Sequence, residues 1–298
     1  MRDDLKTAIR SLRASRGFTF IALTVLALGI GAGTAIFSVV DAVVLRGLPF
    51  DEHDRLGVIY EKDTKRATTF GEGSITPQTY LDWRQLQQPF QQITAVAGTS
   101  FRLKTEGGEP ADARAQRISA EFFPVLRVTP MLGRQFTLDD EVEGRHRVAL
   151  LTYGFWQRRY GGARDVVGRT IELSESPYEI VGVMPASFSY PVGSDRPAEI
   201  LVPLMLPKDD RVKGSSHNYN YTVIGRLKDG VSFQQATDQM WRLSEQLDEK
   251  DPKWAPGRRA RVVTLHEHLV GKVRGWMLVL LGAVVLVLLI ACANVANL

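Results

Sequence analysis

The sequence predicts an α+β membrane protein in which two transmembrane helices flank a large water-soluble domain. The long apolar stretches lie at the two ends, in residues 18–45 and 275–298. Residues 46–274 between them contain the pattern strand, helix, strand twice. That order is typical of a split βαβ, ferredoxin-like subdomain, and the residues between the two repeats predict an inserted, mainly β subdomain.

Charge and cysteine content exclude several classes of function. The formal net charge is +4, but residues 1–17 alone carry +3, so the remaining 281 residues are close to neutral. A basic nucleic-acid-binding surface is therefore not expected, and no nucleic-acid partner is predicted. The single cysteine, Cys292, excludes an intrachain disulfide and a cysteine-rich zinc site.

Residues 1–17 predict a short amphipathic helix on the cytoplasmic side. Apolar side chains recur at helical spacing from Leu5 to Leu12, while Lys6, Arg10 and Arg13 fall on other faces. Such a helix could lie on an anionic leaflet or pack against a neighbouring subunit, and the sequence favours neither. The charge rule weakly favours a cytoplasmic N-terminus.

Residues 18–45 predict the first transmembrane helix. The 23 residues from Phe18 to Val40 contain no charge, which is long enough for a hydrocarbon core of about 30 Å. A cleaved signal peptide is the alternative, but its apolar region is usually only about 7–15 residues long. Gly29, Gly31 and Gly33 lie within this run and predict a face on which another helix can approach closely.

Residues 275–298 predict a second transmembrane helix that is truncated. They contain no charge, and Trp276 stands at their start, where its ring suits a membrane interface. Asn294 and Asn297 could donate hydrogen bonds to a neighbouring helix or approach the far interface. Because the chain stops inside an apolar element, we expect it to be a fragment of a longer protein.

Two separated segments, 46–118 and 208–274, are expected to form the ferredoxin-like subdomain. In the second segment, Ser232 and Gln235 form a capping-box pattern at the start of a helix. The strands are predicted at Arg55–Glu61, Ile93–Ala97, Phe101–Thr105, Arg114–Ile118, Tyr219–Leu227 and Ala260–His266, and the helices at 77–88 and from Phe233.

Residues 119–207 are expected to form the inserted subdomain. It begins with a short helix at Glu121–Leu126 and ends with a strand at Glu199–Leu204. The elements predicted between them are a strand at Val148–Leu151, a helix at Thr152–Arg159 and a hairpin of Arg169–Leu173 with Tyr178–Val183.

Motifs for catalysis are weak. No phosphate-binding loop of the form G-x-x-x-x-G-K-[ST] occurs. His266 and His268 would share one face of the predicted strand, but a metal pair is disfavoured because no cysteine lies near. Asp139, Asp140 and Glu141 resemble catalytic carboxylates, yet acidic residues after Thr137 also suit a helix N-terminus. We therefore expect no enzyme activity, no metal and no cofactor.

Several stretches resemble the permeases of the MacB/FtsX-like superfamily of ABC transporters, in particular their MacB-like periplasmic core domain. The resemblance covers nearly the whole chain, in order and at coherent spacing. The motifs are ALGIGAGTAIFSVVDAVVLRGLPF (27–50), ISAEFFPVLRVTPMLGRQFT (118–137), LLTYGFWQRRYGG (150–162), VVGRTIEL (166–173), YEIVGVMPASFSYP (178–191) and LLIACANVANL (288–298), together with residues 5–16. The chain also resembles the N-terminal part of duplicated orphan permeases.

The resemblance implies a multi-pass protein of the bacterial inner membrane with a large periplasmic domain, whose ferredoxin-like part is of the porter type. It implies a non-catalytic permease subunit of an export or mechanotransmission system, with ATP hydrolysed only by a cytoplasmic ABC ATPase. It also implies a homodimer or pseudo-dimer and leaves room for a periplasmic adaptor. The alternative function is a membrane-anchored extracytoplasmic sensor or receptor.

Overall fold

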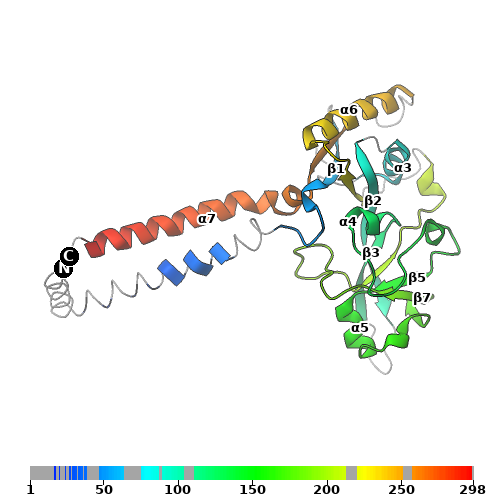
Figure 1. The fold of residues 1–298 in the computed structure, drawn as a ribbon, viewed down its shortest axis with the longest axis horizontal. Coiled ribbons are helices and arrows are strands. Elements are labelled where there is room, and N and C mark those ends of the chain that lie inside the picture. Colours follow the sequence, from blue (N-terminus) through cyan, green and yellow to red (C-terminus); the bar gives the residue numbers. More distant parts are fainter. Residues whose placement is uncertain are drawn as a thin grey trace. The chain divides into compact units, whose positions relative to one another are not determined.

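Two units make up the chain in the computed structural model: Leu48–Leu269, and Met1–Gly47 with Val270–Leu298. The structure describes residues 17, 20, 24, 27, 29–31, 33–35, 37–38, 47–63, 75–86, 89–103, 111–212, 220–250 and 257–296. The expected amphipathic helix of residues 1–17 lies, apart from Gly17, outside them. Figure 1 shows the first unit as a sheet with helices and, in the second, helix α7 (Leu265–Ala296) together with described helical residues of the first end segment.

Half of the sheet has the predicted split βαβ order. The strands lie in the order β10-β1-β9-β2, and each neighbouring pair is antiparallel. Each crossover, β1-α3-β2 or β9-α6-β10, therefore joins strands separated by one strand of the other crossover. The elements are β1 (Leu56–Asp63), α3 (Pro77–Leu86), β2 (Phe90–Leu103), β9 (Thr222–Leu227), α6 (Phe233–Lys250) and β10 (Arg258–Thr264).

The inserted residues extend the same sheet. Beyond β2 the order continues β3-β8-β5-β7-β4, and β6 pairs with β7 and with the end of β2. The elements are β3 (Ala111–Ile118), α4 (Phe122–Leu126), β4 (Leu132–Gly133), η3 (Leu138–Glu141), β5 (Val148–Leu151), α5 (Tyr153–Tyr160), η4 (Arg164–Val166), β6 (Thr170–Leu173), β7 (Ser176–Val183), β8 (Ile200–Pro203) and η5 (Asp209–Arg211).

Two strands that the sequence predicts separately form one continuous strand, β2. The sequence predicts a break between Ile93–Ala97 and Phe101–Thr105, but β2 runs through Gly98-Thr99-Ser100 without interruption. β3 pairs with it along this whole stretch, from Val96↔Ile118 to Leu103↔Ala111. The continuous ladder keeps this small, polar tripeptide extended, so its turn-like composition does not produce a turn.

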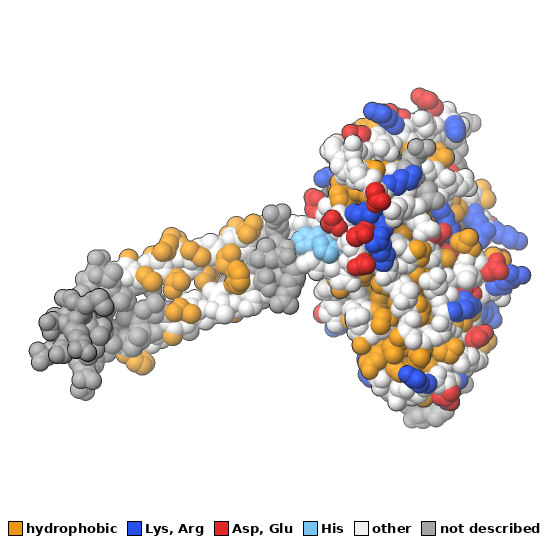
Figure 2. Space-filling model, viewed as in Figure 1, with side chains coloured by type: hydrophobic (Ala, Val, Ile, Leu, Met, Phe, Trp, Pro, Cys, Tyr) orange, Lys and Arg blue, Asp and Glu red, His pale blue; other side chains and the backbone are white. Residues whose placement is uncertain are grey.

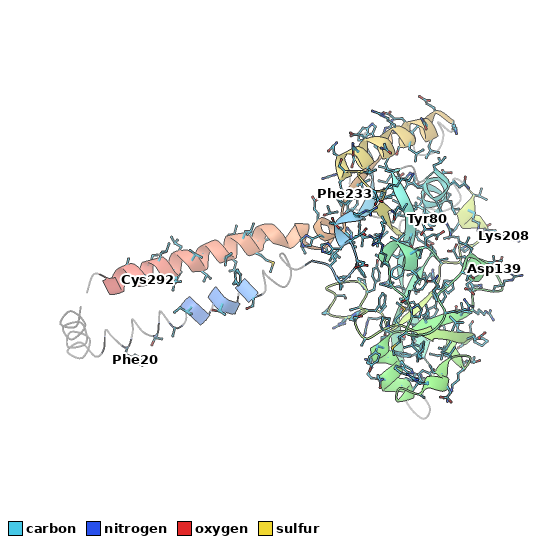
Figure 3. All side chains as sticks on the ribbon, in the orientation of Figure 1. Phe20, Tyr80, Asp139, Lys208, Phe233 and Cys292 are labelled. Carbon is cyan, nitrogen blue, oxygen red and sulfur yellow. The ribbon has the colours of Figure 1, made fainter. Side chains whose placement is uncertain are left out.

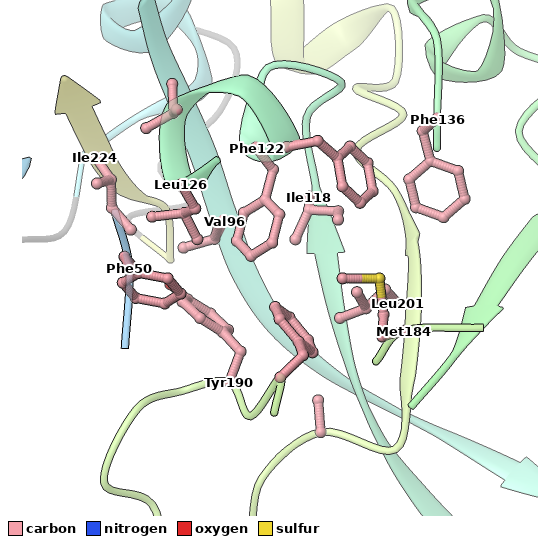
Figure 4. Close-up of a cluster of buried hydrophobic side chains, with 14 of the residues drawn as sticks. Phe50, Val96, Ile118, Phe122, Leu126, Phe136, Met184, Tyr190, Leu201 and Ile224 are labelled. Atoms are coloured by element: carbon pink, nitrogen blue, oxygen red, sulfur yellow. The ribbon is translucent and has the colours of Figure 1, made fainter. Parts of the chain in front are cut away.

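The two faces of the ferredoxin-like half are covered differently. On one face α3 and α6 pack through Tyr80, Trp83 and Met240 against the strands. The predicted capping box forms, because Ser232 Oγ accepts from Gln235 N–H and Gln235 Oε1 accepts from Ser232 N–H. On the other face α4 and the β7–β8 loop contribute aromatic side chains, with Phe122 and Tyr190 meeting edge to face (Figure 4).

Two glycines let aromatic rings lie directly on the helix-covered face. Gly57 and Gly225 are opposite each other in the register of β1 and β9. A Cβ atom added at Gly225 would lie 2.5 Å from the Phe90 ring, and one added at Gly57 would lie 2.8 Å from the Phe233 ring. Both rings therefore occupy space that a side chain would fill.

The outer side of β10 is bonded to helix α6 rather than to another strand. Thr237 Oγ1 accepts from Val262 N–H and donates to the Val262 carbonyl, at 3.1 and 3.2 Å. Ser244 Oγ accepts from Ala260 N–H at 3.2 Å. Two hydroxyl groups on one helix thus occupy the backbone groups in the middle of this edge strand.

The last strand ends before the predicted histidine pair. β10 stops at Thr264, whose Oγ1 accepts the Glu267 N–H at 2.9 Å and begins helix α7 (Leu265–Ala296). His266 and His268 therefore lie on a helix, about 200° apart around its axis, and not on one face of a strand. Within the residues that the structure describes, no cluster of three potential metal ligands occurs.

Candidate functional site

The predicted helix-packing residues lie in the unit formed by the two end segments. The residues described between Gly17 and Ser38 are helical, and Gly29 is buried whereas Gly31 is exposed. A Cβ atom at Gly29 would lie 3.3 Å from Leu288 Cδ1, and one at Gly33 would lie 3.6 Å from Val284 Cγ1. The described surroundings of Gly31 are open to 4 Å. The contact therefore involves Gly29 and Gly33, but not Gly31.

The spacing of these contacts fixes the relative direction of the two helices. Gly29 and Gly33 are one turn apart, as are Val284 and Leu288, and the earlier glycine meets the later residue of α7. The helices therefore pack antiparallel, and Figure 3 labels Phe20 on one and Cys292 on the other. Asn294 belongs to α7, and Asn297 lies outside the described residues.

A helix that spans a membrane must be both long and apolar. Among the residues that the structure describes, no single helix is both long and apolar enough to span a membrane. Helix α7 is bent at a break between Leu265–Gly271 and Gly275–Ile290, and these two segments meet the requirement only when taken together, by length and composition alone.

The chain enters the sheet unit at Leu48–Arg55, here called the N-terminal junction. A buried arginine, Arg226 on β9, fixes this segment and is only 1% exposed. It donates to the carbonyls of Asp51, Glu52 and Val125 at 2.8, 3.1 and 2.8 Å. Burial lowers the pKa of Arg226 from its usual value, but a guanidinium stays charged at neutral pH. One charged group thus ties the junction to β9 and to the end of α4.

Surface charges surround the same junction. Glu52 accepts from Arg55 and lies 2.8 Å from Arg127 Nη1. Arg55 also donates to the Leu227 carbonyl at 2.6 Å and pairs with Asp229. The hydrogen bond from Arg127 lowers the pKa of Glu52, and Arg55 adds to this effect.

The chain leaves the sheet unit at Thr264–Leu269, here called the C-terminal junction. The Tyr60 hydroxyl on β1 is 2.5 Å from His268 Nδ1, and Leu265 is buried in the aromatic cluster of the sheet. β1 follows the N-terminal junction directly and pairs with β10 over seven residues, from Gly57↔Thr264 to Asp63↔Arg258. The two junctions therefore connect to neighbouring, hydrogen-bonded strands.

The carboxylates that the sequence singled out have structural partners. Asp140 pairs with Arg134 and accepts from the Thr137 N–H, which completes a capping box. Burial opposes ionisation, but these bonds lower the pKa of Asp140. Glu141 pairs with Arg84 at 2.9 Å, and burial raises its pKa. Asp139 pairs with Arg145. These contacts agree with the helix N-terminus interpretation.

Sequence similarity now decides the family. A sequence profile described as the MacB-like periplasmic core domain matches residues 19–243 of this chain. The chain belongs to that family. The MacB-like match includes Gly29, Gly33 and the N-terminal junction with Arg226, and it ends within α6, before β10 and the C-terminal junction.

Curated relatives carry the same family name. The chain is 26% identical over 247 residues to "Macrolide export ATP-binding/permease protein MacB" of Shigella dysenteriae serotype 1 and of Escherichia coli strain K12. Each match covers 80% of this chain but 36% of the relative. The chain thus spans about a third of the length of the curated relatives it matches.

A solved structure shares the fold. A permease-protein domain from Porphyromonas gingivalis superimposes with a TM-score of 0.55 at 16% identity, covering 72% of this chain and 92% of that domain. The mixed α+β architecture of the MacB-like domain is therefore shared with a protein of very different sequence.

Sequence reasoning missed Arg226. The pattern of Tyr219–Leu227 predicted only a strand, although Arg226 falls on the same side of β9 as Ile224, which is buried in the aromatic cluster. The available signal was an arginine at an inward position of an alternating strand. Because an isolated buried charge is costly, such a residue indicates hydrogen-bonding partners.

Proposed function

We propose that this chain is part of a non-catalytic permease subunit of an ABC-type export or mechanotransmission system in the bacterial inner membrane. The family membership supports this, because the curated relatives are named export ATP-binding/permease proteins. The end segments would cross the membrane, and the sheet unit would lie in the periplasm. Figure 2 shows hydrophobic side chains on the described part of the two helices and charged side chains interspersed over the sheet unit.

The observation that carries the proposal is the connection of both junctions to adjacent strands. A displacement of the first helix would reach the sheet through the N-terminal junction and Arg226. A displacement of the first turns of α7 would reach β10, because the helix begins where that strand ends. The sheet unit would therefore respond to relative movement of the helices, driven by a cytoplasmic ABC ATPase that hydrolyses ATP. A homodimer or pseudo-dimer and a periplasmic adaptor are further proposed partners.

Affinity purification tests the assignment. The native gene product would be tagged, crosslinked in membranes and purified, and its partners would be identified by mass spectrometry. We expect a stoichiometric ABC ATPase whose hydrolysis rate depends on the permease. Recovery of a kinase or another signalling protein in its place would favour the alternative, a membrane-anchored sensor or receptor.

Two leucine substitutions test the helix contact within that complex. Gly29→Leu places a side chain where an added Cβ atom alone would lie 3.3 Å from Leu288 Cδ1, so Leu288 must shift and the close helix contact is disturbed. We expect the permease-dependent part of the ATPase rate to fall at least fivefold. Gly31→Leu is the matched control, because its described surroundings are open. Equal rates for both variants would contradict a coupling role for this contact.

A further inference from the structure

A cavity of about 240 Å³ lies over the face of the sheet opposite α3 and α6. Its floor is formed by β2, β3 and β9, and its walls by the β7–β8 loop and the first residues of α7. Figure 4 shows Val96, Tyr190 and Ile224 in the cluster over this face. The other lining residues used below are Gly98, Gln116, Val192, Thr222, Leu265, His268 and Leu269.

The lining combines apolar walls with a few hydrogen-bonding groups. Its described residues include no Lys, Arg, Asp or Glu. The Gln116 amide and the Thr222 hydroxyl lie on the floor, and neither makes a side-chain hydrogen bond with the residues that the structure describes. An apolar cavity with convergent, unused polar groups is typical of a small-molecule site. A charged ligand would lose hydration here without gaining an opposite charge.

We propose that this cavity binds a small neutral amphiphile, with an aliphatic or cyclic apolar body and one hydroxyl or carbonyl group. The volume equals that of about eight water molecules, which suits a molecule of the size of cyclohexanol. The apolar body contacts Ile224, Leu265 and Leu269, and the polar group reaches Gln116 or Thr222. Metal and phosphate ligands do not fit this lining.

The position of the cavity predicts how a bound ligand would affect the C-terminal junction. Leu265, His268 and Leu269 belong to the first turns of α7, whereas the floor belongs to three strands. A bound molecule therefore contacts the C-terminal junction on one side and the strands β2, β3 and β9 on the other. Because it binds only when both walls are in place, it stabilises that arrangement by mass action.

Ligand-detected NMR on the full chain in lipid nanodiscs tests the site with cyclohexanol as the probe. Gly98→Leu fills the cavity: the Cβ atom meets only Gln116 Nε2, at 3.8 Å, so the side chain extends into the space without a backbone clash. Ser100→Leu, on the same strand and face but outside this cavity, is the matched control. Partition into lipid is the same for all variants, so only the saturable signal is compared.

We expect the saturable signal in the native chain and in Ser100→Leu, and at least a fivefold loss in Gly98→Leu. Cyclohexanecarboxylate at pH 8 should give none. Thr222→Val keeps the volume and removes the hydroxyl, and should weaken binding roughly threefold to tenfold. Equal saturable binding to the native chain, Gly98→Leu and Thr222→Val, equal binding of the carboxylate, or no saturable binding at all would overturn the proposal. The assay needs no ATPase, so its outcome is independent of the proposed transport function.

Discussion

The two junctions of the sheet unit are held by different kinds of interaction. The N-terminal junction lies outside the strands and is fixed by Arg226 through two of its backbone carbonyls, those of Asp51 and Glu52. The C-terminal junction has no loop, because Thr264 ends β10 and caps α7. The first depends on long-range side-chain contacts, chiefly those of Arg226 and Arg55, whereas the second is continuous backbone structure to which Tyr60 adds a side-chain bond. Substitutions should therefore affect them unequally.

Arg226→Met is expected to have the largest effect. It removes all three hydrogen bonds and leaves the carbonyls of Asp51, Glu52 and Val125 without this donor, so the free energy of unfolding should fall by about 3 kcal/mol. Chemical denaturation of the purified chain, followed by tryptophan fluorescence, measures the change. Arg117→Met, at an exposed arginine on β3, is the control. A loss equal to that of the control would show that the junction does not depend on this contact.

Tyr60→Phe should have a smaller effect at the other junction. It removes the hydroxyl bonded to His268 but keeps the ring, so we expect a loss of about 1 kcal/mol. Hydrogen exchange should increase at the first turns of α7 and remain unchanged at Asp51 and Glu52. Equal increases at both junctions would mean that they are not held independently.

Thr264→Ala tests the helix cap. The Glu267 N–H loses its side-chain acceptor, at an expected cost of about 1 kcal/mol or less. Thr264→Ser keeps the acceptor and should restore most of the stability in the same denaturation assay. A serine variant as unstable as the alanine variant would contradict capping by the hydroxyl.

The smallest expected effect is a pH dependence at the N-terminal junction. The pKa of Glu52 is lower in the folded chain than its usual value, first because of the bond from Arg127. Its stabilising contribution is therefore present above the unfolded pKa and is lost as the pH falls through the folded pKa. Glu52→Gln should flatten the decline of stability below about pH 4.5, near the usual value for glutamate. If stability declined at acid pH equally in Glu52→Gln and in the native chain, the ionised Glu52 side chain would not contribute to the stability of the N-terminal junction.

The alternation of strand and helix patterns was enough to predict the ferredoxin-like half and most of the insertion. These signals are local: the capping box at Ser232 and the buried run Val148–Leu151 are visible in a short window. The continuity of β2 and the role of Arg226 were not predictable in this way, since both depend on partners far along the chain. The start of α7 was missed because its first turns are polar, whereas the hydropathy pattern marks only the later, apolar residues.

In the candidate site too, features with a local sequence signal were predicted and those that depend on distant partners were not. The GxxxG spacing indicated Gly29 and Gly33, but only the position of α7 separates them from Gly31. The cavity beside the C-terminal junction combines residues from five segments of the chain. No local pattern could have brought them together.

The hydroxyl groups of Thr237 and Ser244 also limit how this protein can assemble. By occupying the middle of β10, they leave few backbone groups there for an incoming strand from a second copy or an extended peptide. At the opposite end of the sheet, β4 offers two residues, and the four-residue strand β6 pairs with β7 along its length and with β2 at Leu173. Subunits that join through this unit should therefore meet through side chains on its faces or helices, and recognition should depend on surface shape and charge rather than on strand addition.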